Sequence, residues 1–251
     1  MGEEHQHDEW AFETLAVHAG QSPDAATGAV VTPITLSTTF AQSDVGVHQG
    51  YEYSRSGNPT RSALEQQVAA LERARHGLAF ASGLAAEDSI LRLLRPGQRI
   101  LLGDDAYGGT FRLISKVWSP LGFPWSAVDL ADLDAVLADW PDDTGMVWLE
   151  TPTNPLLTCF DIEAIATAAH ARGALVVVDN TFATPYLQQP LALGADIVVH
   201  SATKYLGGHS DVVGGFVAVG DDALAERLRF LQNAAGAVPS PFDAYLVLRG
   251  V

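Results

Sequence analysis

The sequence predicts an α/β fold in which a mostly parallel, doubly wound sheet follows an extended N-terminal arm. From about residue 61 onward, short apolar runs of strand length alternate with segments of helical spacing, which is typical of this fold class. Two of the runs, residues 174–178 and 195–199, are almost entirely apolar, as are parallel strands that are covered on both faces. Residues 1–60 are instead rich in Gly, Ser, Thr and Pro and lack periodicity. We therefore expect them to form an arm that gains its order by packing on something else.

The first half of the predicted domain contains two helices and two strands before a third helix begins. Helical spacing covers residues 62–71, where Leu64, Val68 and Leu71 share one face. The further elements expected here are a strand at 77–81, a helix from Ser82 to about 94, a strand at 99–102, a loop at 107–109 and a helix from about 110.

The second half continues the alternation. A strand at 145–149 precedes a helix that Asp161 caps and that ends near residues 172–173. Strands at 174–179, 195–200 and 214–219 complete the predicted sheet. There is no internal repeat and no low-complexity tract, so a single domain from residue 61 to residue 251 is the simplest interpretation.

Composition narrows the function class. The chain has 251 residues, is 47% hydrophobic and carries a formal net charge of -16, which argues against nucleic acid as a partner because phosphate binding needs a basic surface. No apolar run approaches the roughly 20 residues of a membrane span, and the polar, acidic start does not resemble a signal peptide. The single cysteine, Cys159, permits no disulfide within the chain, and we expect it to be a packing residue. A cytoplasmic location is the default expectation.

Two charged residues follow neighbouring apolar runs, at the strand ends where open α/β sheets bind their ligands. Asp179 ends the run at 174–178, and Lys204 lies just beyond the run at 195–199. Asp179 alone could equally be a helix cap or a turn former, and Lys204 could be a surface lysine at a strand end. As a pair they match pyridoxal phosphate, which needs a lysine for covalent attachment and an acid beside its ring nitrogen. We expect Lys204 to be buried, because burial lowers the pKa of a lysine and frees its amine.

Hydroxyl and backbone donors that could bind a phosphate lie nearby in the predicted fold. Ser82 and Gly83 stand at a strand-to-helix junction, where exposed N–H groups and the helix dipole favour anions. The simpler alternative is that Ser82 only caps the helix. Ser201 and Thr203 flank Lys204 and could donate to the same phosphate.

Two aromatic or basic segments remain open to alternative interpretations. Tyr107 is followed by two glycines, which would allow its ring to lie flat against a planar ligand, although it could also be a surface tyrosine. Arg55 could bind phosphate through both guanidinium arms or could be a solvated arm residue. His5 and His7 resemble a weak metal site, but no third ordered ligand accompanies them, so we expect no metal site there.

Together these motifs resemble the Cys/Met-metabolism family of pyridoxal-phosphate enzymes, and most of all the bacterial cystathionine γ-synthases and γ-lyases within it. The matching runs are residues 12–20, 51–60, 81–85, 105–110, 150–155, 178–181 and 201–208. The resemblance implies a fold type I transferase and a γ-replacement or γ-elimination on cystathionine or an O-acylhomoserine. A small amino acid would be the substrate. Gly109 departs from the methionine γ-lyases, which carry a cysteine there.

The resemblance also implies a place for each residue around the cofactor. Lys204 would bind the cofactor and move protons, Asp179 would pair with the ring nitrogen, and Tyr107 would stack on the ring. The phosphate-binding set would be Ser82, Gly83, Leu84, Ser201 and Thr203, with Asn154 near the phenolic oxygen and the substrate carboxylate. Tyr53 and Arg55 would reach the phosphate of a neighbouring subunit, which implies self-association as a dimer or tetramer.

One departure concerns length. Members of the family continue into a C-terminal domain that supplies the arginine for the substrate carboxylate, whereas this sequence ends at Val251. We therefore expect an arm at residues 1–60 and a cofactor-binding domain at 61–251, without the small C-terminal domain. Two alternatives follow, which are a catalytically impaired cofactor-binding fragment that acts by association and a sibling activity such as O-acylhomoserine sulfhydrylase.

Overall fold

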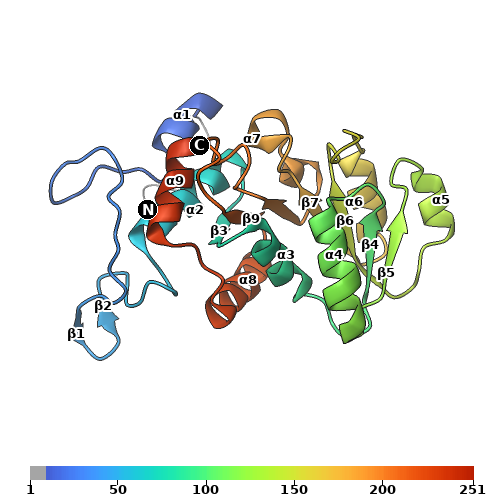
Figure 1. The fold of residues 1–251 in the computed structure, drawn as a ribbon, viewed down its shortest axis with the longest axis horizontal. Coiled ribbons are helices and arrows are strands. Elements are labelled where there is room, and N and C mark those ends of the chain that lie inside the picture. The colour runs from blue at the N-terminus through green and yellow to red at the C-terminus, as the bar shows by residue number, and fades with distance from the viewer. Residues whose placement is uncertain (1–9) are drawn as a thin grey trace.

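The computed structural model describes residues 10–251, so His5 and His7 lie outside the described part of the chain. Its centre is a seven-stranded sheet in the order β3-β9-β8-β7-β6-β4-β5 (Figure 1). The strands are β3 (His76–Phe80), β4 (Arg99–Gly103), β5 (Trp125–Val128), β6 (Thr144–Glu150), β7 (Leu175–Asp179), β8 (Ile197–His200) and β9 (Gly215–Val219). The doubly wound α/β fold expected from the sequence is confirmed.

Strand direction follows the expectation with one exception. The strands β5, β4, β6, β7 and β8 pair in parallel with one another. Strand β9 is antiparallel to both of its neighbours, β3 and β8. The apolar run at residues 214–219 is buried on both faces, and such a run has the same sequence pattern in either direction. The sequence therefore identified the strand and not its orientation.

Helices cover both faces of the sheet. One face carries α3 (Gly83–Leu91), α8 (Asp222–Ala235) and α4 (Gly108–Arg112), which continues through a π-helical η1 (Leu113–Trp118) and a 3-10 turn η2 (Ser119–Leu121). The other face carries α2 (Pro59–Leu71), α5 (Leu133–Ala138), α6 (Ile162–His170) and α9 (Pro241–Gly250). The short α7 (Thr184–Leu187) and η3 (Pro190–Leu193) connect β7 to β8. Large side chains such as Phe80, Trp148 and Phe216 are fully buried between these layers.

Local sequence explains where the main helices begin. Asn58 accepts hydrogen bonds from the backbone N–H groups of the first turn of α2, and Pro59 occupies its first position. The side chains of Ser82, Asp161, Asp221 and Ser240 cap α3, α6, α8 and α9 in the same way. Each cap satisfies an N–H group that the helix itself cannot pair.

The N-terminal arm is only partly extended. It contains a helix, α1 (Phe12–His18), and a small hairpin of β1 (Gln42–Asp44) and β2 (Val47–His48). Leu15 and Ala19 pack against Leu71 of α2, so this part of the arm is anchored on the chain's own domain. The hairpin extends beyond the β3 edge of the sheet, at the end opposite β5 (Figure 1). A helix of only two turns gives too short a periodic pattern to be recognised in the sequence.

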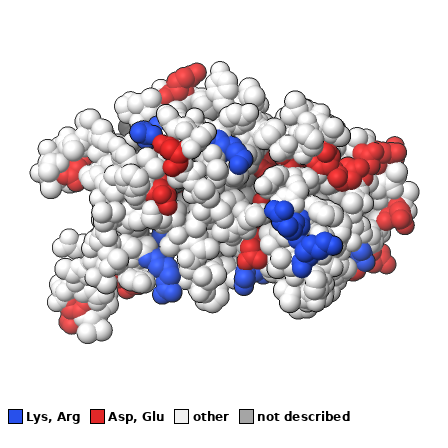
Figure 2. Space-filling model, in the orientation of Figure 1, with Lys and Arg blue, Asp and Glu red and all other residues white. Residues whose placement is uncertain are grey.

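The acidic balance of the chain is visible on its surface. On the face shown in Figure 2, Lys and Arg side chains form small separate groups among the acidic ones. Within residues 10–251, no helix has the length and apolar character needed to cross a membrane.

Candidate cofactor site

Asp179 is the last residue of β7 and is only 7% exposed. The backbone N–H of Thr181 donates to its Oδ1 at 2.9 Å. Burial raises the pKa of Asp179, and the hydrogen bonds from Thr181 oppose that rise. A buried carboxyl group therefore stands at the carboxyl end of the sheet, where the sequence places it.

Thr181 connects Asp179 to the predicted phosphate-binding residues. Its hydroxyl oxygen accepts the N–H of Ser201 at 2.8 Å. A Cβ atom on Gly83 would lie 3.1 Å from Cβ of Ser201, so the first turn of α3 touches the segment that follows β8. Ser82 caps α3 by accepting the N–H of Ala85 at 3.1 Å, so the capping alternative describes its oxygen correctly. The hydroxyl hydrogen of Ser82 remains able to donate. In the first turn of α3, Gly83 is buried and Leu84 is exposed.

Lys204 lies in the loop that joins β8 to β9, and its side chain is exposed. The expectation of a buried lysine was therefore wrong. The loop turns away from the sheet edge directly after Ser201, where the Lys204 N–H bonds to the Ser201 carbonyl at 3.1 Å. The hydroxyl of Thr203 contacts Gly214, donating to its carbonyl at 3.3 Å and accepting its N–H at 3.1 Å. Thr203 thus closes the base of the loop that carries Lys204.

Tyr107 stands at the start of α4, and its side chain is 42% exposed. Its backbone N–H donates to Oε2 of Glu150 at 2.7 Å. A side chain at Gly109 would collide with the Tyr107 ring, so the ring lies directly against the backbone there. Of the two glycines that follow Tyr107, Gly109 gives the ring its space, whereas a Cβ on Gly108 would meet nothing within 4 Å.

Two further carboxyl groups at this edge were missed in the sequence. Glu150 ends β6, is 5% exposed and is the register partner of Asp179. Burial, followed by the charge of Asp179, raises the pKa of Glu150 to about 8. Burial and Asp179 likewise raise the pKa of Glu87, on α3, to about 8. Glu150 could have been found from the sequence, because it follows the strand at 145–149 just as Asp179 follows the strand at 174–178. Glu87 lies within a helix, where a single glutamate gives no such signal.

Three predicted residues are less closely tied to this edge. Asn154 is half-buried in the loop after β6, which leaves the sheet at the same carboxyl edge as Asp179. Tyr53 and Arg55 are exposed on the arm, and the Arg55 guanidinium lies 5.4 Å from the centre of the Tyr53 ring. The arm bonds to α8 through Ser56, and among residues 10–251 no contact joins Tyr53 or Arg55 to Asp179 or Lys204. The structure does not bring these two residues to the site of their own chain.

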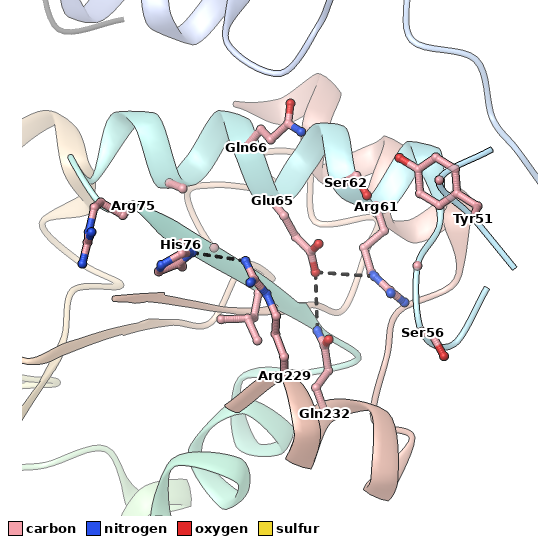
Figure 3. Close-up of a pocket in the computed structure, with 15 residues that line it drawn as sticks. Tyr51, Ser56, Arg61, Ser62, Glu65, Gln66, Arg75, His76, Arg229 and Gln232 are labelled. Carbon is pink, nitrogen blue, oxygen red and sulfur yellow. Dashed lines mark hydrogen bonds and ion pairs between the residues drawn. The ribbon is translucent and has the colours of Figure 1, made fainter. Parts of the chain in front are cut away.

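A cavity of about 490 Å³ lies elsewhere, between the arm, α2, β3 and α8 (Figure 3). None of the predicted cofactor residues lines it. At its centre Oε1 of Glu65 accepts the N–H of Ala79 at 2.9 Å and lies 3.4 Å from both Nε of Arg61 and Nε2 of Gln232. Gln232 also donates to the carbonyl of Ala79 at 2.7 Å. These contacts join α2 and α8 to the edge strand β3 and cover it, which is a structural function. We therefore place the functional site at the carboxyl edge and not in this cavity.

The residues at the carboxyl edge fit pyridoxal phosphate. Glu87, Glu150 and Asp179 form no ion pair with any Lys or Arg in the described part of the chain, so a cationic ring nitrogen would supply the missing positive charge. The close approach of Gly83 to Ser201 joins a helix N-terminus to a hydroxyl donor, which suits a phosphate.

A metal site is not indicated, because residues 10–251 contain no group of three or more metal-ligating side chains. Cys159 is exposed, which corrects the expectation that it packs inside.

Comparison with known proteins gives consistent matches. The model of the Cys/Met metabolism PLP-dependent enzyme family matches residues 13–251. The chain is 58% identical over 240 residues to a cystathionine gamma-synthase of Mycobacterium bovis, covering 95% of this chain and 62% of that protein. It is 53% identical over 242 residues to a cystathionine beta-lyase of Coxiella burnetii, covering 96% of this chain and 62% of that protein.

A solved structure shares the fold closely. The cystathionine gamma-lyase of Lactobacillus plantarum, complexed with L-serine, is 51% identical and superposes with a TM-score of 0.93, over 96% of this chain and 63% of that one. The chain thus spans a little over three-fifths of the length of these three relatives. The chain belongs to the Cys/Met metabolism family of PLP-dependent enzymes, whose cofactor is pyridoxal phosphate.

Proposed function

We propose that this chain is the cofactor-binding part of a trans-sulfuration enzyme that acts on a small sulfur-containing or O-acylated amino acid. The reaction would be γ-replacement or γ-elimination on cystathionine or an O-acylhomoserine. The observation that supports it best is the meeting of Asp179, the first turn of α3, Ser201 and the Lys204 loop at one sheet edge.

Residues at this sheet edge would bind both the phosphate and the ring of pyridoxal phosphate. The N–H groups of Gly83 and Leu84, with the hydroxyls of Ser82, Ser201 and Thr203, would bind the phosphate. The Asp179 carboxylate would hold a proton at the ring nitrogen, and the Tyr107 ring would lie against the face of the cofactor. Asn154 would donate to the phenolic oxygen and help to orient the substrate carboxylate.

Pyridoxal phosphate, when bound, supplies an electron sink for charge that develops at the substrate Cα. The Lys204 amine would take the proton from Cα and return it at a later step, because its exposed position on a loop allows it to move between adjacent carbons. Tyr107 would assist with a second proton through its hydroxyl. Loss of a proton from Cβ would then expel the γ substituent.

Self-association completes the proposal. Tyr53 and Arg55 are exposed on an arm that contacts neither Asp179 nor Lys204 in the described chain, which suits delivery to the phosphate site of a second subunit. We therefore propose a dimer or tetramer in the cytoplasm, with residues 1–60 as the shared arm and residues 61–251 as the cofactor domain.

Covalent trapping tests the cofactor assignment. The purified chain would be incubated with pyridoxal phosphate, reduced with borohydride and digested for mass spectrometry. We expect one modified peptide carrying the adduct at Lys204, and none in Lys204→Ala. Lys116, the other lysine of the chain, provides an internal control for random modification. An adduct shared equally between the two lysines would contradict the proposal.

Turnover assays separate the activities that the relatives represent. Relatives at similar identity bear gamma-synthase and beta-lyase names, so the reaction type must be read from products. Cystathionine, O-succinylhomoserine and O-acetylhomoserine would each be supplied, the latter two with cysteine or sulfide. Release of 2-oxobutanoate indicates γ-elimination, and release of pyruvate with homocysteine from cystathionine indicates β-elimination. Cystathionine formation indicates γ-replacement, and homocysteine from sulfide indicates a sulfhydrylase. A Lys204 adduct without turnover of any substrate would instead favour a protein that binds the cofactor and acts by association.

A further inference from the structure

The position of the Tyr107 ring depends on the backbone that carries it. The side chain is 42% exposed, and within residues 10–251 no hydrogen bond to its hydroxyl group is found. The bond that ties this residue to the sheet is the one from its backbone N–H to Oε2 of Glu150, at 2.7 Å. In the described part of the chain, the position of the ring is therefore not set by a hydrogen bond of its own hydroxyl group.

Glu150 is a rigid partner for that bond. It is the last residue of β6, a strand that pairs with β4 on one side and β7 on the other. Its side chain is 5% exposed, and its register partner on β7 is Asp179. The acceptor for the Tyr107 N–H is thus fixed to the same framework as the carboxylate that would hold the ring nitrogen.

The residues after Tyr107 restrict the ring further. The ring lies so close to Gly109 that a Cβ there would be 2.9 Å from its Cδ1 atom and closer still to Cε1. Thr110 is 2% exposed and bonds to Glu87 on α3. The turn that carries Tyr107 is therefore attached to β6 at its start and to α3 one residue after Gly109.

We propose that Glu150 is a positioning residue of the cofactor site: by accepting the Tyr107 N–H it sets the place of the Tyr107 ring relative to Asp179. The inference rests on the proposed function, since the place of the ring matters for catalysis only if the cofactor ring lies beside it. Glu150 acts through Tyr107 and need not touch substrate or cofactor.

Paired variants of the full 251-residue chain test this inference. Glu150→Gln keeps an oxygen acceptor at nearly the same place, whereas Glu150→Leu removes the acceptor at similar size. Each is made with Tyr107 present and again in a Tyr107→Ala background. Three quantities are measured: the hydrogen-exchange rate of the Tyr107 amide in the cofactor-free protein, the dissociation constant for pyridoxal phosphate, and the visible circular dichroism of the bound cofactor.

In the variants that keep Tyr107, we expect Glu150→Leu to speed hydrogen exchange of the Tyr107 amide. We also expect it to weaken cofactor binding about 5- to 10-fold, the size expected for one lost hydrogen bond. Its visible dichroism should fall as well, because the ring no longer fixes the asymmetry around the cofactor. Glu150→Gln should stay within about 2-fold in affinity, since an amide oxygen still accepts the N–H. In the Tyr107→Ala background, Glu150→Leu should add little further loss, because the ring through which Glu150 acts is gone.

Three outcomes would overturn the inference. An equal loss of affinity in both backgrounds would show that Glu150 serves local stability alone, which urea unfolding of each variant would report independently. A loss in Glu150→Gln as large as in Glu150→Leu would assign the effect to charge. Unchanged amide exchange in Glu150→Leu would show that the bond does not constrain Tyr107. These results leave the proposed function intact, whereas failure of the parent chain to bind pyridoxal phosphate at Lys204 would remove both.

Discussion

At the scale of single residues, the site is defined by buried carboxyl groups that pair with no Lys or Arg of residues 10–251. Glu87 and Glu150 flank Asp179, and burial is the first cause of the raised pKa of all three. The charge of Asp179 raises the pKa of the other two further. Burial and mutual repulsion therefore favour the protonated form of these groups in the folded protein.

This arrangement predicts how stability depends on pH. The pKa of Glu87 is raised from an ordinary 4.5 to about 8, so the folded chain keeps a proton that the unfolded chain releases. Its contribution to stability is complete below about pH 4.5 and is lost as the pH rises towards 8. We expect the free energy of unfolding of the cofactor-free chain to fall over this range, and Glu87→Gln to make that fall shallower. Urea unfolding at several pH values measures the slope.

Asp143→Asn is the control for this pH dependence. The hydrogen bond from Arg99 lowers the pKa of the Asp143 carboxyl group. The contribution of Asp143 to stability is therefore lost only when the pH falls through that lowered pKa. The slope above pH 4.5 should be the same as in the parent chain. Parallel profiles for the parent and Glu87→Gln would contradict the assignment of the raised pKa to Glu87.

Sequence patterns locate the site residues that directly follow a strand. They do not locate site residues that other elements, such as helices, bring to the sheet edge. Asp179, Ser201 and Lys204 were predicted because each lies just beyond a strongly apolar run. Glu87 comes from a helix, and only the packing of α3 on the sheet brings it to the edge. The exposure of Lys204 depends on the direction of a loop, which the composition of that loop does not determine.

At the scale of elements, β9 positions the first turn of α3. A Cβ on Gly215 would overlap the carbonyl of Ser82 and lie 2.9 Å from the N–H nitrogen of Gly83. The phosphate-binding turn can approach the sheet this closely only because Gly215 has no side chain.

We expect Gly215→Ala to move that turn and to weaken pyridoxal phosphate binding by more than about 10-fold, with a loss of about 1 to 3 kcal/mol in stability from overpacking. Gly220→Ala is the matched control, because a Cβ there meets nothing within 4 Å. Cofactor titration and urea unfolding measure the two effects. Equal behaviour of the two variants would contradict the prediction.

A buried pair connects α2 to the end of β8. Nε2 of His200 lies 2.6 Å from Oε1 of Glu72, both side chains are fully buried, and Asn180 donates to the same oxygen at 2.8 Å. Removing one partner of a buried pair leaves the other unsatisfied. We expect Glu72→Leu to lower the free energy of unfolding by about 3 kcal/mol, measured by urea unfolding.

Asp211→Asn removes the carboxylate of a surface pair with Arg249 and should change stability by less than about 1 kcal/mol. A loss in Glu72→Leu no larger than in this control would show that the buried pair contributes little.

Predictability differed among the strands and helices for physical reasons. The interior strands β7 and β8 were predicted because covered strands are continuously apolar. Strand β5 was missed, since Trp125–Val128 is a short, partly exposed edge strand with no clear apolar run. Helix α1 was missed because so short a helix barely repeats its pattern, although its burial of Leu15 is clear in the structure.

At the scale of the whole molecule, the arm is joined to the domain through α1. Leu15, 8% exposed, packs with Ala19 against Leu71, while the hairpin of the arm projects beyond the sheet. Helix α1 is therefore part of the folded domain, even though the hairpin of the arm is exposed.

We expect Leu15→Ala to destabilise the chain by about 2 kcal/mol, because it removes buried methyl groups from that contact. Val17→Ala lies on the same helix, is 61% exposed in the parent and should have little effect. Thermal or urea unfolding compares the two. A similar, small change in both would show that α1 is not part of the cooperative unit.

The two hydrogen bonds of Thr181 have a consequence for ligand choice. One reaches Asp179 and the other reaches Ser201, so a single residue links the half-site for a ring nitrogen to the half-site for a phosphate and fixes the spacing between them. A rigid ligand that carries both groups at that spacing behaves as a bivalent ligand, for which binding of the first end presents the second at high effective concentration. Pyridoxal phosphate should thus bind far more tightly than pyridoxal and inorganic phosphate supplied together.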